Sequence, residues 1–474
     1  MPTHLSRLQR DRAPRPTRDE LYAAGKALRK TQPHVEHAIF VAGERDPAAI
    51  LAEQNAARLP ELVSLRMGRM LASPFTFYRG TAAIMAHDLA QGVSTGIQVV
   101  ACGDAHLSNF GLFASPQRTL VFDLNDFDEA ASAPWEWDLK RLVASVVIGA
   151  RDLGLTEEKT RKAARKAAAA YREGMREMVG HSSLDRYYLR LDTDLAHPSF
   201  TTDAQDVLAK ATRSARKRTS QRFVDKLTER AADGTRLIVE NPPVMTHVSP
   251  ESEARVEELF EKYRATVSTD VAFLLGNFTL TDVARRAVGV GSVGTRCFIL
   301  ILTGPAGEAL VLQVKEAPAS VLETYGDVDP RRLLQARSRQ EYDELGEGYR
   351  VVSCQRILQA VSDPFLGYLR FAGEDGIVRD FYVRQFRDMK GSVELEQLTP
   401  SEFSKYGEAC GTLLARAHAQ SPIAPMIAGY LGKSGSFDGA MAEWAIGYAE
   451  QSALDYAELL AARDRGDFEA VSDR

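Results

Sequence analysis

The residues best able to do chemistry lie in two neighbouring stretches, CGDAHLSNFG (residues 102–111) and TLVFDLNDFDE (residues 119–129). The first brings Asp104, His106 and Asn109 into one short loop. The second carries four acids: Asp123, Asp126, Asp128 and Glu129. Acids this close together repel one another unless a cation lies among them, and carboxylate and amide oxygens are ligands that divalent cations accept. The two stretches therefore predict a divalent-metal site.

The spacing within the loop indicates separate roles for its residues. Asp104 and Asn109 stand five positions apart, the separation at which a kinase catalytic loop presents its base and a metal-binding amide. We assign Asp104 as the base that accepts the proton of an attacking hydroxyl group. His106 lies between them and is expected to orient the loop by hydrogen bonds. Asp123 follows two apolar strand residues and is the first candidate for a further metal ligand, with Asp126 as the alternative.

A glycine-rich segment, GVGSVG (residues 289–294), lies between two apolar runs that are typical of strands. Such a turn lets backbone amides approach phosphates without a Cβ in the way, and a lysine on the returning strand can reach the same phosphates. The run FILIL that follows is β-like, so the helix of a dinucleotide-binding fingerprint is missing. The predicted nucleotide contacts are Gly289, Gly291, Ser292, Gly294 and Lys315.

Two further expectations concern the nucleotide-binding residues. Lys315 should need a carboxylate partner, and the sequence leaves four choices open: Glu316, Glu323, Glu341 and Glu344. The strand FYVRQF (residues 381–386) is expected to contact adenine through its backbone.

The loop resembles the H-G-D-x-H-x-x-N motif of aminoglycoside and choline-type phosphotransferases, which belong to the protein-kinase-like superfamily. Cys102 stands where those enzymes usually have His. The segment WDLKRL (residues 137–142) is similar to the D-L-A segment that follows their metal-binding Asp. The resemblance implies ATP and Mg²⁺ as cofactors.

The order of the motifs differs from that of an ordinary kinase, in which the glycine-rich loop and the lysine precede the catalytic loop. Here GVGSVG and Lys315 follow Asp104 by about 180 to 210 residues. The late segment YGEACGTLLARAHA (residues 406–419) resembles the L-A-x-L-H-A helix that comes just before the catalytic loop in phosphotransferases. The resemblance therefore implies a circularly permuted chain, an arrangement that proteins tolerate where their termini lie at the surface.

Over nearly its whole length the sequence also resembles a bacterial family known as domain of unknown function 2252. The matching stretches are SPFTFYRG, GDAHLSNFG, FDLNDFDEA, WEWDLKRL, GVGSVGTRCF, LQVKEA, SDPFLGY and FYVRQFRDMKGS. This resemblance implies no activity, so the expected function depends on the motifs.

The expected fold is α+β: a two-lobed, circularly permuted protein-kinase-like fold with an antiparallel β-rich lobe over a larger helical lobe. The apolar periodicity divides the chain into four segments. They are an N-terminal helical arm (1–60), a helical lobe with the catalytic loop and the metal-binding acids (61–282), a β-rich nucleotide-binding lobe with the glycine-rich loop (283–392) and C-terminal helices that complete the helical lobe (393–474).

Composition excludes several classes of protein. The formal net charge of -5 argues against general affinity for nucleic acid, because such binding requires a basic surface. The 4 cysteines lack the spacing of a zinc site or a disulfide framework. No apolar run approaches the roughly 18 residues of a membrane span. We expect a cytoplasmic protein that binds neither membrane nor nucleic acid, and the sequence does not fix its oligomeric state.

These features predict an ATP- and Mg²⁺-dependent phosphotransferase that acts on an unidentified small-molecule or protein acceptor, with transfer of a nucleotidyl group as the less favoured reaction of the same site. Two alternatives stay open. One is a metal-dependent phosphoester hydrolase built on Asp104, His106, Asp123 and Asp126. The other is a non-catalytic nucleotide-binding protein.

The leading interpretation makes a spatial prediction, because a single triphosphate must touch the metal, the lysine and the glycine-rich loop. The Lys315 ammonium should lie within roughly 10 Å of the Asp123 or Asp126 carboxylate. Asp104 and Asn109 should share that cleft. The helix near residues 407–419 should pack beneath the catalytic loop.

Overall fold

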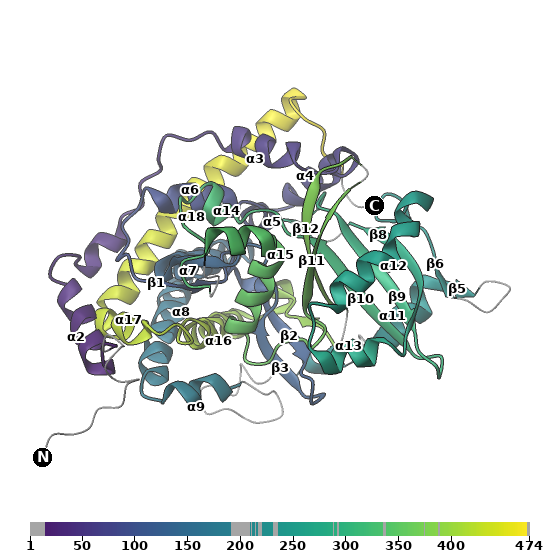
Figure 1. Cartoon of the computed structure of the whole chain (residues 1–474). Coiled ribbons are helices and arrows are strands. Elements are labelled where there is room, and N and C mark those ends of the chain that lie inside the picture. The colour runs from purple at the N-terminus through teal and green to yellow at the C-terminus, as the bar shows by residue number, and fades with distance from the viewer. Residues whose placement is uncertain are drawn as a thin grey trace, which may run out of the picture.

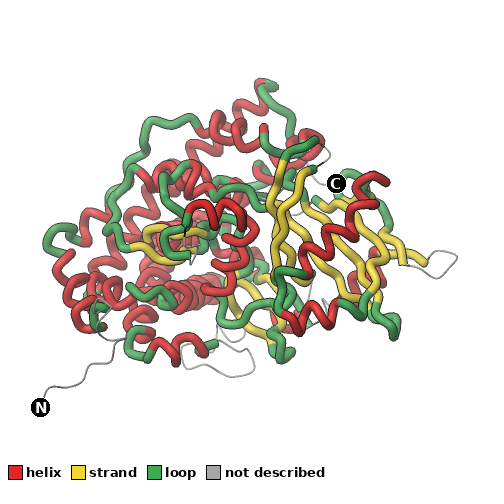
Figure 2. Tube along the Cα trace, in the orientation of Figure 1, coloured by secondary structure: helices red, strands yellow, loops and turns green. Residues whose placement is uncertain are grey.

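The computed structural model describes residues 15–190, 209, 211–213, 215–216, 220–230, 236–287, 289–291, 293–334, 338–373, 375–386 and 389–471. It has a helical lobe and a strand-rich lobe that lie side by side (Figure 1). In Figure 2 the helices, in red, dominate one side, and most strands, in yellow, gather on the other. The chain is α+β with an antiparallel sheet, as the sequence predicts.

The strand-rich lobe is built on a six-stranded sheet in the order β11-β12-β10-β9-β8-β7, in which neighbouring strands are antiparallel. The strands are β7 (Met245–His247), β8 (Thr279–Arg286), β9 (Cys297–Thr303), β10 (Ala309–Glu316), β11 (Gly367–Ala372) and β12 (Val378–Gln385). Both β7 and β8 begin before residue 283, so the sheet starts earlier in the chain than expected. A strand as short as β7, lying among helices, gives too few residues for periodicity to reveal it.

Among the described residues, five helices and a small hairpin accompany this sheet along the chain. The helices are α11 (Ser220–Leu227), α12 (Pro250–Arg264), α13 (Thr269–Leu275), α14 (Val321–Thr324) and α15 (Arg339–Leu358). The hairpin pairs β5 (Thr228–Arg230) with β6 (Arg236–Ile238). Along β10, Leu312 packs with α12 and α13 on one face of the sheet, whereas Val311 packs with α11 on the other. Because side chains alternate along a strand, Lys315 lies on the face opposite α12.

The helical lobe surrounds α7 (Trp135–Asp152), which is buried from Trp135 to Ala150. Its other helices are α2 (Arg18–Leu28), α3 (Pro47–Ala56), α4 (Val63–Met70), α5 (Pro74–Gly80), α6 (Ala82–Ala90), α8 (Glu157–Met178), α9 (Ser183–Tyr188), α16 (Pro400–His418), α17 (Ala424–Leu431) and α18 (Ser436–Arg465). Short 3₁₀ turns lie at His34–Ala38, Pro60–Leu62, Leu107–Asn109 and Leu395–Gln397. Helices α8, α16 and α18 all contact α7, so both ends of the chain build this lobe.

Two small sheets hold the motif loops. β1 (Gln98–Ala101) pairs with β4 (Ala131–Pro134), and β2 (Phe110–Ala114) pairs with both β3 (Leu120–Leu124) and β13 (Gly391–Ser392). Residues 102–109 join β1 to β2 and keep the name catalytic loop from the role predicted for them; residues 125–130 join β3 to β4 and are called the acid-rich loop. Antiparallel pairing therefore brings the two loops together at one end of these strands.

Within the described residues, no helix combines the length and the apolar character that crossing a bilayer requires.

The close contact of α16 with α8 leads to a stability prediction. A Cβ at Gly411 would lie 2.4 Å from the Ala167 carbonyl oxygen, so one helix must shift to admit it. We expect Gly411→Ala to lower the free energy of unfolding by about 1–3 kcal/mol. Gly439→Ala is the control, because its Cβ would meet nothing within 4 Å and alanine favours a helix by up to about 1 kcal/mol. Equal urea midpoints for the two variants would contradict this account.

Candidate functional site

A cavity of about 750 Å³ lies between the sheet and the helical lobe. Residues from both predicted motifs line it, among them Asp104, Asn109 and Asp126 from the helical lobe. Gly289 and Gly291 of the glycine-rich turn line the same cavity from the other side. Segments almost two hundred residues apart therefore meet, as the spatial prediction requires.

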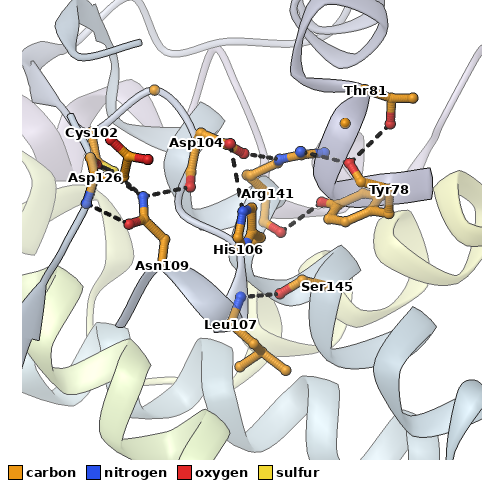
Figure 3. A network of polar contacts seen from close by, with 12 residues as sticks. Tyr78, Thr81, Cys102, Asp104, His106, Leu107, Asn109, Asp126, Arg141 and Ser145 are labelled. Carbon is orange, nitrogen blue, oxygen red and sulfur yellow. Dashed lines mark hydrogen bonds and ion pairs between the residues drawn. The ribbon is translucent and has the colours of Figure 1, made fainter. Parts of the chain in front are cut away.

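Helix α7 holds the catalytic loop through three side chains on one face. The Asp138 carboxylate accepts hydrogen bonds from the backbone N–H groups of Cys102, at 2.6 Å, and Gly103, at 2.9 Å. One turn later Arg141 binds the Asp104 side chain, and Ser145 accepts the Leu107 N–H at 3.0 Å. Figure 3 shows Arg141 and Ser145 reaching the loop. The i, i+3, i+7 spacing places all three on the side of α7 that faces the loop.

Helix α16 supports the loop from below, as the sequence predicts. The Tyr406 hydroxyl donates to the carbonyl oxygen of Leu107 at 2.9 Å, and His418 Nε2 lies 3.0 Å from the Asp138 carboxylate. Both side chains are buried. The segment 406–419 thus fixes the loop directly and also through Asp138.

Gly103 allows the sharp turn of the catalytic loop. Its φ angle is 80°, in the left-handed region, and a Cβ there would lie 2.1 Å from the Glu129 carbonyl oxygen. The loop therefore packs directly on the backbone of the acid-rich loop.

The Asp104 side chain is 22% exposed and points into the cavity. Arg141 Nε donates to Asp104 Oδ1 at 2.7 Å, and Arg141 also stacks on Tyr78 with its Cζ 3.9 Å from the ring centroid. Although burial alone would lower the pKa of Arg141, Asp104 helps to keep it above the ordinary value. The carboxylate is thereby fixed in direction.

His106 is buried and lies beside Asp104, with Nε2 3.6 Å from Asp104 Oδ2. Burial lowers the pKa of His106 to about 4, although Asp104 opposes the shift. The imidazole is therefore neutral at pH 7. Its Nδ1 is buried without a hydrogen-bond partner, so the expected orienting role through hydrogen bonds stays a prediction.

Asn109 joins the two motif loops (Figure 3). Its Nδ2 donates to the carbonyl oxygens of Asp104 and Asp126, each at 3.0 Å, and its Oδ1 accepts the Asp126 N–H at 2.7 Å. A carbonyl oxygen has two lone pairs, so Oδ1 keeps acceptor capacity for a cation.

Lys315 crosses from the sheet to the acid-rich loop. Its ammonium lies 3.4 Å from Asp126 Oδ1 and 2.5 Å from Asp128 Oδ2, while the side chain is only 2% exposed. This confirms the prediction of a separation below about 10 Å. Burial alone would lower the pKa of Lys315, but Asp126 and Asp128 outweigh it and raise the pKa.

The carboxylate partner of Lys315 is Asp128, and none of the four glutamates considered from the sequence takes this place. Tyr382 also donates to Asp128, at 2.6 Å. Glu316, the nearest of the four in sequence, pairs instead with Arg296 and Arg379. Side-chain alternation explains this, because adjacent residues of β10 point to opposite faces.

Asp123 does not fit the metal-binding role first assigned to it. Its side chain is 1% exposed, and its oxygens accept the N–H groups of Ala360, at 2.8 Å, and Leu124, at 2.9 Å. Burial raises its pKa. Asp126 is 44% exposed and lines the cavity. We therefore transfer the role to Asp126, the alternative that the sequence left open.

The charges around Asp126 favour its ionised form. Burial would raise the pKa of this carboxyl, but Lys315, Arg384 and Lys390 together hold it well below its usual range. Sequence reasoning gave Arg384 and Lys390 no role. Burial lowers the pKa of Lys390 itself to about 7. Only their proximity in the folded chain reveals these cavity cations.

The glycine-rich turn is docked on the N-terminal helical region. Arg58 donates to the carbonyl oxygen of Val293 at 2.6 Å, and Arg69 donates to that of Gly289 at 3.0 Å. Gly289 and Gly294 have φ angles of 76° and 90°, which favour glycine. Ser292 lies outside the described residues.

The strand FYVRQF is less suited to adenine binding than expected. β12 lies between β10 and β11, and both neighbours pair with it over Phe381–Val383. The backbone N–H and C=O groups of Phe381–Val383 therefore already pair with the neighbouring strands and are not available to adenine.

No group of three or more His, Cys, Asp or Glu side chains in the described ranges is arranged to hold a metal ion. Mg²⁺ often takes only one or two protein carboxylates and completes its shell with phosphate and water. Asp126 and Asp128, with the Asn109 oxygen, fit that donor set. Two-metal hydrolysis finds less support, since Asp123 lies outside the cavity.

A family model described as "Uncharacterized protein conserved in bacteria (DUF2252)" matches residues 58–462. The chain belongs to this family. The match spans the catalytic loop, the acid-rich loop, the whole sheet and most of α18. No curated protein and no solved structure matches the chain.

The support that Asp138 gives the loop can be measured. In Asp138→Asn an amide NH₂ replaces one carboxylate oxygen and faces a backbone N–H donor, so we expect a loss of about 2–3 kcal/mol in the free energy of unfolding. Asp152→Asn, at the exposed end of the same helix, should change it by less than about 0.5 kcal/mol. Chemical denaturation measures the free energy of unfolding of both variants. If Asp138→Asn loses no more than Asp152→Asn, Asp138 does not stabilise the loop as described.

Proposed function

We propose that the protein is an ATP- and Mg²⁺-dependent phosphotransferase that acts on an unidentified acceptor. One observation carries the proposal. Lys315 meets Asp126 across 189 residues of sequence, and Asp126 lines the cavity that Asp104 and the glycine-rich turn also line. No local constraint would bring these groups together.

The arrangement of the strand-rich lobe supports a kinase-like fold. The glycine-rich turn joins β8 to β9, and Lys315 lies on β10, the third strand when β8 is counted as the first. Protein kinases carry their phosphate-binding lysine on their third strand, after a glycine-rich loop. A departure is that Lys315 pairs with Asp128, whereas the kinase lysine pairs with a helix glutamate.

The way the chain builds its lobes supports circular permutation. Helix α16, late in the sequence, packs against α7 and α8 and holds the catalytic loop through Tyr406. Read from β8 through α18 and then from α5 to α7, the elements come in the order of a kinase.

The polar groups of the cavity fit a magnesium–nucleotide complex. Asp126, Asp128 and Asn109 offer oxygen ligands of the type Mg²⁺ prefers. Lys315 supplies positive charge beside them for the phosphate oxygens. Bound Mg²⁺ would neutralise charge on those phosphates.

Asp104 fits the role of the base. Its carboxylate is 22% exposed to the cavity, and the charge of Arg141 fixes its orientation from the buried side. A hydroxyl group of the acceptor placed in the cavity could donate its proton to the free face of this carboxylate. His106 is neutral and does not compete as a charged partner.

Nucleotide binding tests the first half of the proposal. A ligand at a hundred times its dissociation constant stabilises the folded state by about 2.7 kcal/mol. We expect ATP with Mg²⁺ to raise the melting temperature and ATP with EDTA to raise it less. Asp126→Asn should lose most of the Mg²⁺-dependent rise in melting temperature. Asp123→Asn, the same change outside the cavity, should keep that rise when it is measured against the melting temperature of the same variant without ligand. If only Asp123→Asn loses the Mg²⁺-dependent rise in melting temperature, Asp123 and not Asp126 is the metal ligand.

Turnover tests the second half. Asp104→Asn should reduce phosphoryl transfer from ATP by at least about a hundredfold, because the base acts on the acceptor hydroxyl group. Its ATP- and Mg²⁺-dependent melting shift should match that of the wild type. Transfer to a library of hydroxyl-bearing metabolites, followed with labelled ATP, supplies the assay. Binding of ATP without any transfer would favour the non-catalytic alternative.

A further inference from the structure

Three arginines from the N-terminal helical region line the cavity, and the proposed transfer chemistry gives none of them a role. Arg58 follows α3, Arg66 lies on α4 and Arg79 lies on α5. Arg66 is fully buried. We call these three residues the arginine group.

The arginine group has no carboxylate partner within hydrogen-bond distance among the described residues. Arg58 donates to the Val293 carbonyl oxygen, and Arg66 donates to side-chain oxygens of Asn55 and Gln54. In all three arginines the Nε–H is buried without a hydrogen-bond partner. These are three cations with unused donors beside one cavity.

Several other buried arginines of this protein are paired with acids. Arg45 binds Asp88 and Asp455, and Arg141 binds Asp104. Burial alone would lower the pKa values of Arg45 and Arg141, but these acids outweigh it and raise them. In the arginine group burial prevails: it lowers the pKa of Arg58 to about 10 and that of Arg79 below its usual value. A buried charge without a counter-ion is costly, and an anion from outside the chain would offset this cost.

The position of the group identifies the source of that anion. Arg79 lies next to Tyr78, whose ring stacks on the Arg141 that holds Asp104, and the charge of Asp104 partly opposes the lowering of the Arg79 pKa by burial. Lys315 already forms ion pairs with the acids on the sheet side of the cavity. Arg79 thus lies on the side of the cavity near Asp104, the proposed base, where an acceptor must place its hydroxyl group, while Arg58 lies beside the glycine-rich turn.

We propose that the arginine group binds an oxyanion of the acceptor, a phosphate or carboxylate group that the acceptor carries in addition to its reacting hydroxyl group. Guanidinium groups suit both anions because their N–H groups form a planar fork. Only the assignment of the oxyanion to the acceptor rests on the proposed function. Binding of an oxyanion at these residues does not require ATP.

Calorimetric titration with inorganic phosphate at fixed ionic strength tests the site. The wild type should bind saturably, and Arg79→Gln and Arg58→Gln should each bind at least about tenfold more weakly, since each removes a charged donor. Arg151→Gln, on α7 outside the cavity, should bind as the wild type does. Melting curves without ligand establish that each variant is folded, and Arg79→Lys should recover part of the affinity.

A second titration, with ATP and Mg²⁺, separates the possible sources of the anion. Arg79→Gln should keep the wild-type affinity for ATP, and saturating ATP should leave phosphate binding in place. Absence of saturable phosphate binding to the wild type, or equal phosphate affinity in the variants, would overturn the proposal. If phosphate and ATP compete, and Arg79→Gln weakens the binding of both, the oxyanion cannot be assigned to the acceptor. Arginine-dependent phosphate binding without ATP binding would support the anion site and refute the phosphotransferase.

Discussion

The ammonium group of Lys315 lies between two carboxylates, Asp126 and Asp128, that belong to the other lobe. Burying these charges is costly unless all of them stay together, because each alone would lose its hydration without compensation. The sheet must therefore sit where β10 delivers this lysine to the acid-rich loop. The cavity and its lining follow from that constraint.

A second constraint acts within the helical lobe, where α7 positions the catalytic loop. Asp138 binds the loop backbone, and Arg141 binds the Asp104 side chain one turn later. The helix is buried along almost its whole length, so its side chains have little freedom to move. The direction of the Asp104 carboxylate is thus set by a rigid element rather than by the loop itself.

The cavity contains charge of both signs, arranged on different walls. The acids lie with Lys315 where the acid-rich loop meets the sheet, and the arginine group lies on the side of the N-terminal helices. Such separation suits a site that brings together a metal-bound anion and a second anionic molecule. The same arrangement leaves buried donors unused when the cavity holds neither.

The sequence by itself determined the local elements and the types of residue in each loop. The spacing of Asp104 and Asn109, the glycine turn with Lys315 on the second strand after it and the helical period of 406–419 are all properties of neighbouring residues. Tertiary structure decided which acid enters the cavity. Asp123 and Asp126 differ by three positions; backbone groups near Ala360 occupy the oxygens of the first, whereas the second is 44% exposed and lines the cavity. The partner of Lys315 and the closeness of Arg79 to Asp104 were decided in the same way, because contacts between distant segments depend on how lobes pack and leave no mark in local periodicity.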